Sequence, residues 1–396
     1  MKPKILSQKF SDLLKIMTSN VSNAGLGFLA SILFAKYLTV EDFSIFAEVN
    51  NYALILVTFF ELGLPVFIVA FSRYSKAIYS IGVFYWACST IAFLFLAILL
   101  TTYLGINEYL VLTTALASVM ALFKLTAAKY QSLAMWSKFS ILNSMFSLSK
   151  FITAFILLLS FELLSIEMSV RYIFVLLILI CLLPLLPVLK KVKTHRKITL
   201  KKLKWCYKKG SPYASINVVI TLAMRADLMI AGMLLSANEI ASYAVSIQLA
   251  FVFPLITNTL LSYYLKESHY DEVVLPGVKT LFIKLIKFLG IIIPIAYLFF
   301  LFFEIVLFDN KFGSIAIIAS VLSVAYCGGV IFTPFEAILY KKNAKAILQL
   351  KVCQMLIIII LSGILGGVLS TMGIALAVVI SRFYGWFFIA RKIHAN

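Results

Sequence analysis

The chain alternates long apolar runs with short polar segments along almost its whole length. Each run has about 20 residues with few charges, the length that an α-helix needs to cross a hydrocarbon core about 30 Å thick. Backbone groups in lipid must be hydrogen-bonded within their own segment, and the runs lack the alternation of membrane β-strands, so they predict helices. The twelve predicted helices are 13–38, 43–71, 78–104, 108–129, 139–161, 170–189, 211–235, 241–265, 280–307, 313–340, 345–369 and 371–391.

Composition supports an all-α integral membrane protein. Apolar residues make up 63% of the chain and charged residues 13%, far from the balance of a soluble domain. The net charge of +19 could reflect either a nucleic-acid partner or a bias of positive charge toward cytoplasmic loops. The distribution of the charges along the chain decides between them.

Lysine and arginine gather in every second connection. Of the 35 basic residues, 30 fall on one side by this count, including the ten of segment 190–209 and the group Arg382, Arg391 and Lys392. The opposite connections are short and acidic, with Glu41 and Asp42 as the first example. A nucleic-acid patch would not follow alternate loops, so the charge predicts topology: both termini and segment 190–209 lie in the cytoplasm.

A weak internal repeat divides the chain in half. Residues 33–47 return loosely as 230–244, an offset of 197 residues (230 − 33), with Leu38 matching Leu235 and Ala47 matching Ala244. Each half contains six predicted helices, so both halves start on the same side of the membrane. The pattern predicts two six-helix lobes, 1–189 and 210–396, joined by the basic connector 190–209 and related by a parallel pseudo-twofold along the membrane normal, as in transporters. Contact of the connector with anionic lipid headgroups is the alternative to a merely solvated loop.

The sequence does not predict a metal site or a redox-active site. The five cysteines show no metal-ligand or disulfide spacing, and the three histidines fall in separate predicted loops. We therefore expect no cofactor and no metal site.

Several motifs resemble those of a known family. The turn from Ala35 to Ala47, the segment Glu61-Leu-Gly-Leu64, and the segments 210–213, 225–232 and 238–244 are similar to motifs of polysaccharide exporters. The chain resembles Wzx-type O-antigen flippases of the MOP exporter superfamily, with Ser44 where these proteins usually have glycine.

The resemblance implies a MATE-like pair of lobes around a central cavity in the bacterial inner membrane. It also implies a substrate, an oligosaccharide linked to undecaprenyl pyrophosphate, which moves from the inner to the outer leaflet while its lipid tail stays among the membrane lipids. An O-antigen polymerase and a chain-length regulator are further partners that it suggests; nucleic acid is not one.

Ionisable groups inside membrane helices are costly, so each is a functional candidate. Arg225 suits a pyrophosphate or acidic sugar because guanidinium matches phosphate geometry, although it and Asp227 could instead tie helices together. Asp227 and Glu61 are candidates for ion coupling, because burial favours the protonated form of a carboxylate. Glu61 could equally cap a backbone group freed by Pro65, or pair with a lysine.

Four more polar residues are candidates for lining the cavity. Lys124 and Lys150 could form a cationic surface in the first lobe, although Lys124 could instead extend to the cytoplasmic surface. Asn20 and Asn217, at matching positions of the repeat, could bind sugar hydroxyls or join helices.

Two other functions remain open. A membrane-embedded polysaccharide enzyme, such as an O-antigen polymerase, would carry a large external loop, and an acyltransferase would place a histidine in or near the membrane; the sequence predicts neither feature. A drug or small-molecule exporter of the same superfamily would share the twelve helices. We expect transport rather than catalysis.

Overall fold

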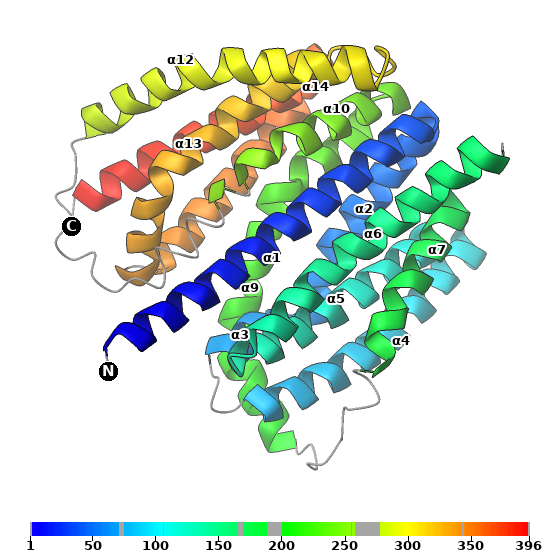
Figure 1. The fold of residues 1–396 in the computed structure, drawn as a ribbon, viewed down its shortest axis with the longest axis vertical. Helices are drawn as coiled ribbons and strands as arrows, with labels where there is room; N and C mark the ends of the chain where they lie inside the picture. The colour runs from blue at the N-terminus through cyan, green and yellow to red at the C-terminus, as the bar shows by residue number, and fades with distance from the viewer. Residues whose placement is uncertain are drawn as a thin grey trace. The chain divides into compact units, whose positions relative to one another are not determined.

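The computed structural model of the chain describes residues 2–70, 75–105, 107–164, 169–187, 200–254, 256–257, 278–342 and 344–394. Every regular element within these ranges is a helix (Figure 1). The all-α prediction is therefore confirmed. His195, His269 and the first ten residues of the predicted connector lie outside the described residues.

The chain divides into two compact units. Unit 1 comprises Met1–Tyr37 and Val49–Thr221, and unit 2 comprises Leu38–Glu48 and Leu222–Asn396. Helices α2 (Val40–Glu61) and α9 (Leu200–Leu234) each begin in one unit and end in the other. The lobes expected at 1–189 and 210–396 stay a prediction.

Unit 1 has one buried helix and one helix that is exposed along most of its length. Within the membrane-length windows, 72% of α5 is buried but only 11% of α4. Apolar side chains can face lipid at no cost, so α4 forms a lipid-facing surface while α5 forms the core. Helices α3, α4, α6 and α7 pack against α5, while α1 packs against α6. The helices that lie wholly in unit 1 are α1 (Lys2–Tyr37), α3 (Leu64–Ala70), α4 (Ser75–Leu104), α5 (Leu110–Ser132), α6 (Trp136–Leu164) and α7 (Val170–Leu182), with the 3-10 turn η2 (Leu183–Leu185) after it.

Unit 2 has the same organisation. Helix α13 is 61% buried in its membrane-length window and α12 only 11%. Helix α13 packs against α10, α12 and α14, so it is the core helix of this unit. The elements are α10 (Ala237–Ala250), α12 (Val278–Phe302), the π-helical segment η4 (Phe303–Leu307), α13 (Ile315–Lys342) and α14 (Ala344–His394).

Two helix breaks affect the predicted spans. The single helix expected at 43–71 is wrong, because Leu62 and Gly63 both adopt positive φ and separate α2 from α3. Pro65, which lacks an N–H donor, is the second residue of α3, where a helix does not need that donor, so it favours the start of a new helix there. The boundary expected between 369 and 371 coincides with Ser370, whose φ of 54° and ψ of −136° interrupt α14.

Eight helices in the described ranges are long and apolar enough to cross a membrane. One of them, Lys345–Lys392, has 48 residues. At 1.5 Å per residue it is about 72 Å long, more than twice the hydrocarbon thickness, so the break at Ser370 divides it into two potential spans. The chain is a multi-pass membrane protein, while the division into twelve spans stays a prediction.

The two copies of the repeat begin their second helix in the same way. Thr39 accepts a hydrogen bond from the backbone N–H of Asp42 at 3.1 Å, and Ser236 forms a capping box with Glu239. These two pairs are 197 residues apart, the offset of the repeat. Hydrogen bonds from Ser370 and Ser236 hold the pKa of the Glu239 carboxyl below its usual value. Each cap satisfies N–H groups that the first turn of a helix leaves unpaired.

The turn between α1 and α2 packs within unit 2. Lys311 Nζ donates a hydrogen bond to the carbonyl oxygen of Leu38, just after the last residue of α1, and burial lowers the pKa of this lysine. The Phe43 and Phe312 rings lie 5.7 Å apart between centroids. A lysine that binds the last carbonyls of a helix is a common C-terminal cap, and here it joins the turn to the segment before α13.

We predict that Gly373→Ala destabilises the protein and that Gly363→Ala does not. The bend at Ser370 brings the backbone of Gly373 so close to Leu365 that a Cβ would lie 2.0 Å from the Leu365 carbonyl oxygen. Overpacking of this kind costs about 1–3 kcal/mol. Thermal unfolding of the purified protein in detergent measures the effect.

Gly363 is the matched control, because it lies in the same helix with no atom within 4 Å of an added Cβ. Equal melting temperatures for the two variants would contradict the bend at Ser370.

Candidate functional site

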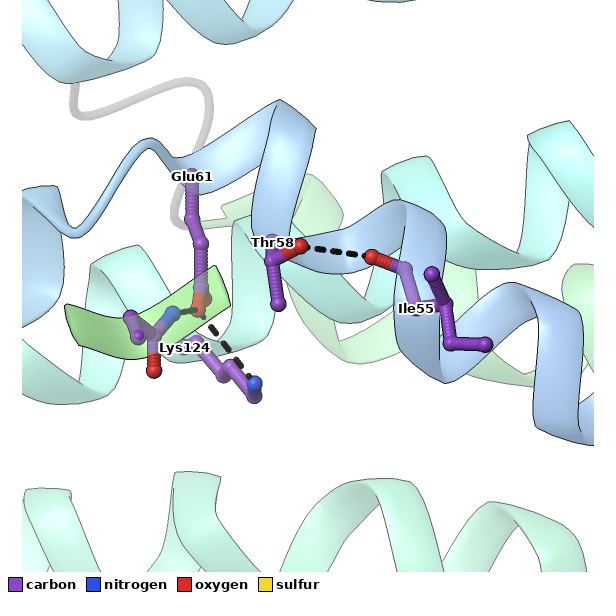
Figure 2. A network of polar contacts seen from close by, with 5 residues as sticks. Ile55, Thr58, Glu61 and Lys124 are labelled. Carbon is purple, nitrogen blue, oxygen red and sulfur yellow. Dashed lines mark hydrogen bonds and ion pairs between the residues drawn. The ribbon is translucent and has the colours of Figure 1, made fainter. Parts of the chain in front are cut away.

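Unit 1 contains a buried polar group at the end of α2, which we call the Glu61 cluster: Glu61, Lys124 and Asn217. Glu61 is the last residue of α2, immediately before the break at Leu62 and Gly63, and only 3% of its side chain is exposed. Lys124 from α5 extends toward it (Figure 2). Asn217 from α9 supplies a third side chain.

The hydrogen bonds of the cluster involve one carboxylate oxygen. Glu61 Oε1 accepts from Asn217 Nδ2 at 2.7 Å and lies 3.5 Å from Lys124 Nζ. Glu61 Oε2 is buried and has no hydrogen-bond partner among the described residues. The lysine side chain is 48% exposed, so the pair joins an interior carboxylate to an accessible cation. Of the contacts considered for Glu61, the structure shows the pair with a lysine, Lys124.

Asn20 and Lys150 lie in a different place, between α1 and α6. Asn20 Oδ1 accepts from Asn143 Nδ2 at 3.3 Å, and Lys150 Nζ donates to Ser31 Oγ at 3.4 Å. A third contact, from Tyr37 Oη to Glu162 Oε1 at 3.2 Å, lies farther along both helices. Polar contacts of this kind join membrane helices.

The three contacts extend over about 26–29 Å of helix at 1.5 Å per residue. Residue numbers increase in the same direction along both helices, so α1 and α6 run parallel. Contact of Asn20 or Lys150 with a substrate stays a prediction.

Unit 2 contains the second polar group, which we call the Asp227 cluster: Arg225, Asp227, Tyr243, Tyr326 and Arg382. Asp227 of α9 is 5% exposed. Its Oδ2 accepts from Tyr243 Oη of α10 at 3.0 Å, and its Oδ1 accepts from the backbone N–H of Leu228 at 2.8 Å. The Tyr243 side chain is fully buried. A buried carboxylate needs such donors, because its desolvation is otherwise unfavourable.

Two arginines act electrostatically on this carboxylate. Arg225 and Arg382 both lie within electrostatic range of Asp227. The Arg382 guanidinium carbon is 5.8 Å from the centroid of the Tyr326 ring, and the buried Arg382 Nε has no hydrogen-bond partner among the described residues. Both arginines are half-buried. The cluster has two guanidinium groups and one carboxylate, so it carries excess positive charge.

An interior site with excess positive charge favours an anion. The electrostatic interaction between two charges is stronger inside a protein than in water, because the effective dielectric constant is lower. Guanidinium groups present several N–H donors in a plane, which matches the oxygens of a phosphate. The chemistry available in the Asp227 cluster is therefore recognition of an anionic group; binding of this kind requires no nucleophile.

The first copy of the repeat lacks this polar pair. The positions equivalent to Asp227 and Tyr243 are Ala30 and Phe46, and both are buried. The acid and the tyrosine that binds it therefore occur together in one copy, and two apolar residues take their places in the other.

The sequence identifies Arg225 and Asp227 as candidates but misses Tyr243, Tyr326 and Arg382. The charge distribution groups Arg382 with the basic cytoplasmic residues, whereas the structure places it within α14, beside Tyr326. Its position inside the predicted span 371–391 is the signal that could have identified it, since charges within spans are functional candidates. The tyrosines give no such signal among many aromatic residues.

No group of three or more potential metal ligands occurs in the part of the chain that the structure describes. Neither cluster has the combination of imidazole, thiolate or several carboxylates that holds a metal ion.

Comparisons with known proteins identify the fold. No protein-family model matches the chain, and no curated protein matches it in sequence. Among solved structures, the lipid II flippase MurJ in an inward closed conformation is similar with a TM-score of 0.62 and 19% identity, over 97% of this chain and 87% of that one.

Two further transporter structures are also similar. An inward-facing multidrug resistance MATE family transporter of the MOP superfamily has a TM-score of 0.62 and 14% identity, over 96% of this chain and 98% of that one. A mutant of the Vibrio cholerae MATE transporter VcmN has a TM-score of 0.52 and 12% identity, over 98% and 97%. The MATE-like fold is confirmed. These similar structures are described as a flippase and as transporters.

We predict that Tyr243→Phe and Asp227→Ala have non-additive effects on stability. Tyr243→Phe removes a donor from a buried carboxylate, and hydrogen bonds to charged groups contribute about 1.5–3 kcal/mol. In the Asp227→Ala background that bond is already absent, so the same tyrosine change should cost much less. Thermal or denaturant unfolding of the four proteins in detergent gives the coupling energy.

Tyr297→Phe in α12 serves as a control for loss of a hydroxyl alone, because this tyrosine lies on the exposed surface of unit 2. Additive costs for the Tyr243 and Asp227 changes would contradict the hydrogen bond between these residues.

Proposed function

We propose that the protein is a flippase that moves undecaprenyl-pyrophosphate-linked oligosaccharides, such as O-antigen repeat units, from the cytoplasmic to the periplasmic leaflet of a bacterial inner membrane. Both termini lie in the cytoplasm in this proposal. The sugar and pyrophosphate cross through a polar interior by alternating access, while the polyprenyl tail remains in lipid. The MATE-like fold and the motifs that resemble polysaccharide exporters support this function.

The observation that carries the proposal is the excess positive charge of the Asp227 cluster. A lipid-linked glycan of this class carries a pyrophosphate, and Arg225 and Arg382 supply guanidinium donors inside the membrane span. Asp227 offsets part of the positive charge of these arginines, so an anion can bind without being held too tightly to leave. An O-antigen polymerase and a chain-length regulator would act on the delivered product.

Glu61 is the preferred group for coupling to an ion gradient. One of its oxygens has no hydrogen-bond partner among the described residues, and the other lies between an amide and a lysine. Asp227 is less suited to this role, because both of its oxygens accept hydrogen bonds and two arginines lie within electrostatic range of it. A proton or a monovalent cation at Glu61 would compete with Lys124 for the carboxylate.

Export of drugs or other small molecules is the second candidate, since MATE transporters are among the similar structures and one of them is a multidrug resistance transporter. The charge of the Asp227 cluster separates the two functions, because a cationic compound would be repelled by a site with two arginines and one acid.

Arg225→Ala and Arg382→Ala should each lower glycan export about tenfold or more, because each removes a charge-assisted contact to the pyrophosphate. The measurement is surface glycan in a deletion strain that carries each variant, together with the lipid-linked precursor that accumulates in the inner membrane.

Arg171→Ala is the matched control: it removes an arginine that pairs with an acid, Glu108, at an exposed position outside the Asp227 cluster. Normal surface glycan in both cluster variants, at normal protein levels, would refute the substrate-binding role of the Asp227 cluster.

Glu61→Gln should abolish the dependence of transport on an ion gradient. The amide retains the size of the side chain and can still accept from Asn217, but it cannot exchange a proton or bind a cation by charge. Transport into proteoliposomes, measured with imposed proton or sodium gradients, tests this expectation.

Glu336→Gln is the control, because Glu336 also pairs with a lysine, Lys351, at 2.8 Å. The coupling role is excluded by unaltered gradient dependence in Glu61→Gln, or by wild-type transport that responds to neither gradient.

A further inference from the structure

The connection between α5 and α6 is a tight and well-defined turn. It consists of Leu133, Ala134 and Met135, and Ala134 adopts a left-handed φ of 53°. The backbone N–H of Met135 donates to the Tyr130 carbonyl at 2.9 Å, and that of Ala134 donates to the Gln131 carbonyl at 3.1 Å. These bonds fix the turn, which presents Leu133 and Met135 to the outside with 36% and 37% of their surfaces exposed.

Two lysines next to this turn converge on one aromatic ring. Lys129 Nζ lies 6.0 Å from the centroid of the Tyr130 ring, and Lys138 Nζ lies 5.7 Å from it. The two ammonium nitrogens are therefore at most 11.7 Å apart, the sum of their distances to the same ring centroid. Like charges repel at this range, so an anion that lies between them is favoured.

Lys129 is held in position by a second ring. Its Nζ lies 4.2 Å from the centroid of Tyr79, which is buried and whose hydroxyl lies 3.4 Å from Thr126 Oγ1. Cation–π contacts of this kind orient an ammonium group without neutralising its charge. The positive charge is therefore ordered before any ligand arrives, which lowers the entropic cost of binding.

The surroundings of the two lysines match the boundary between lipid headgroups and acyl chains. Trp136 begins α6 and packs edge-on against Phe139, with ring centroids 6.2 Å apart. Tryptophan and tyrosine are enriched at this depth of a membrane. The exposed parts of Leu133 and Met135 have a lower free energy in the acyl region than in water.

We propose that Lys129, Lys138, Tyr130 and the turn Leu133–Met135 form a binding site for the headgroup phosphate of an anionic phospholipid. The ammonium groups bind the phosphate, and the apolar turn contacts the adjoining acyl chains. A free phosphate ion could contact the ammonium groups but has no acyl chain to contact the turn. The two contacts together therefore favour a phospholipid over a phosphate ion. The positive-inside pattern assigns this site to the cytoplasmic leaflet. The site shares no residue with the Asp227 cluster and does not depend on what the protein transports.

The test measures lipid-dependent stability of the purified full-length protein in detergent. Phosphatidylglycerol and phosphatidylcholine with identical acyl chains are titrated separately, and the melting temperature is followed by intrinsic fluorescence. Phosphatidylglycerol should stabilise the wild-type protein more than phosphatidylcholine. Lys129→Gln/Lys138→Gln should weaken phosphatidylglycerol binding by about fivefold for each lysine removed.

Lys36→Gln is the matched control. Lys36 Nζ also lies near a tyrosine ring, 5.8 Å from the centroid of Tyr37, but it is not one of the two lysines near the Tyr130 ring. It should retain the wild-type response to phosphatidylglycerol. Should the double variant fail to fold, Lys138→Gln alone carries the test, because Lys138 is exposed.

Two results would overturn the proposal. One is equal stabilisation by phosphatidylglycerol in wild type and in the lysine variants. The other is stabilisation by inorganic phosphate, at matched ionic strength, that equals the effect of the lipid. Glycan export is not part of this measurement, so failure of the proposed transport function would leave its outcome unchanged.

Discussion

A polar or charged group inside a membrane protein is costly unless it has partners within the protein, and this constraint underlies both polar clusters and the helix ends of this molecule. Lipid offers no hydrogen bonds, so the backbone forms helices and the ends of helices are capped, as at Thr39 and Ser236. The interior side chains follow the same rule. Asn217 and Lys124 face Glu61, while Tyr243 donates a hydrogen bond to Asp227 and two arginines lie within electrostatic range of it. Exposed apolar side chains on α4 and α12 carry no such cost.

The constraint is met differently in the two copies of the repeat. Their caps are equivalent, and each unit has one buried core helix and one lipid-facing helix. In the second copy, however, Asp227 and Tyr243 replace the apolar pair of Ala30 and Phe46. A buried acid and its donor are stable only together, because either one alone would leave an unpaired polar group. This asymmetry is the physical basis for unequal roles of the two halves in the proposed transport.

Much of the fold could be predicted, because membrane helices follow directly from the length and composition of apolar runs. The break within the span expected at 43–71 was missed: Leu62 and Gly63 interrupt the helix by their backbone conformation, without any loss of hydrophobicity. The charged candidates Arg225, Asp227 and Glu61 were found because ionisable groups are rare in spans. Arg382 was missed because it was counted with the basic residues near the C-terminus, although it lies inside a predicted span. The tyrosines of the cluster could not be singled out, since a tyrosine that binds an acid has the same local sequence signature as one that faces lipid.

The sequence alone determined the all-helical membrane class of the protein and the offset of the repeat, because hydrophobic length and internal similarity are properties of the chain itself. Only the tertiary structure decided which polar residues meet. Asn20 and Asn217 hold equivalent positions in the repeat, yet one binds Asn143 and the other Glu61. Glu61 and Asn217 are 156 positions apart, and no local pattern connects them. Partners of this kind are chosen by the packing of helices that are distant in sequence, and that packing depends on the shape of all the side chains together.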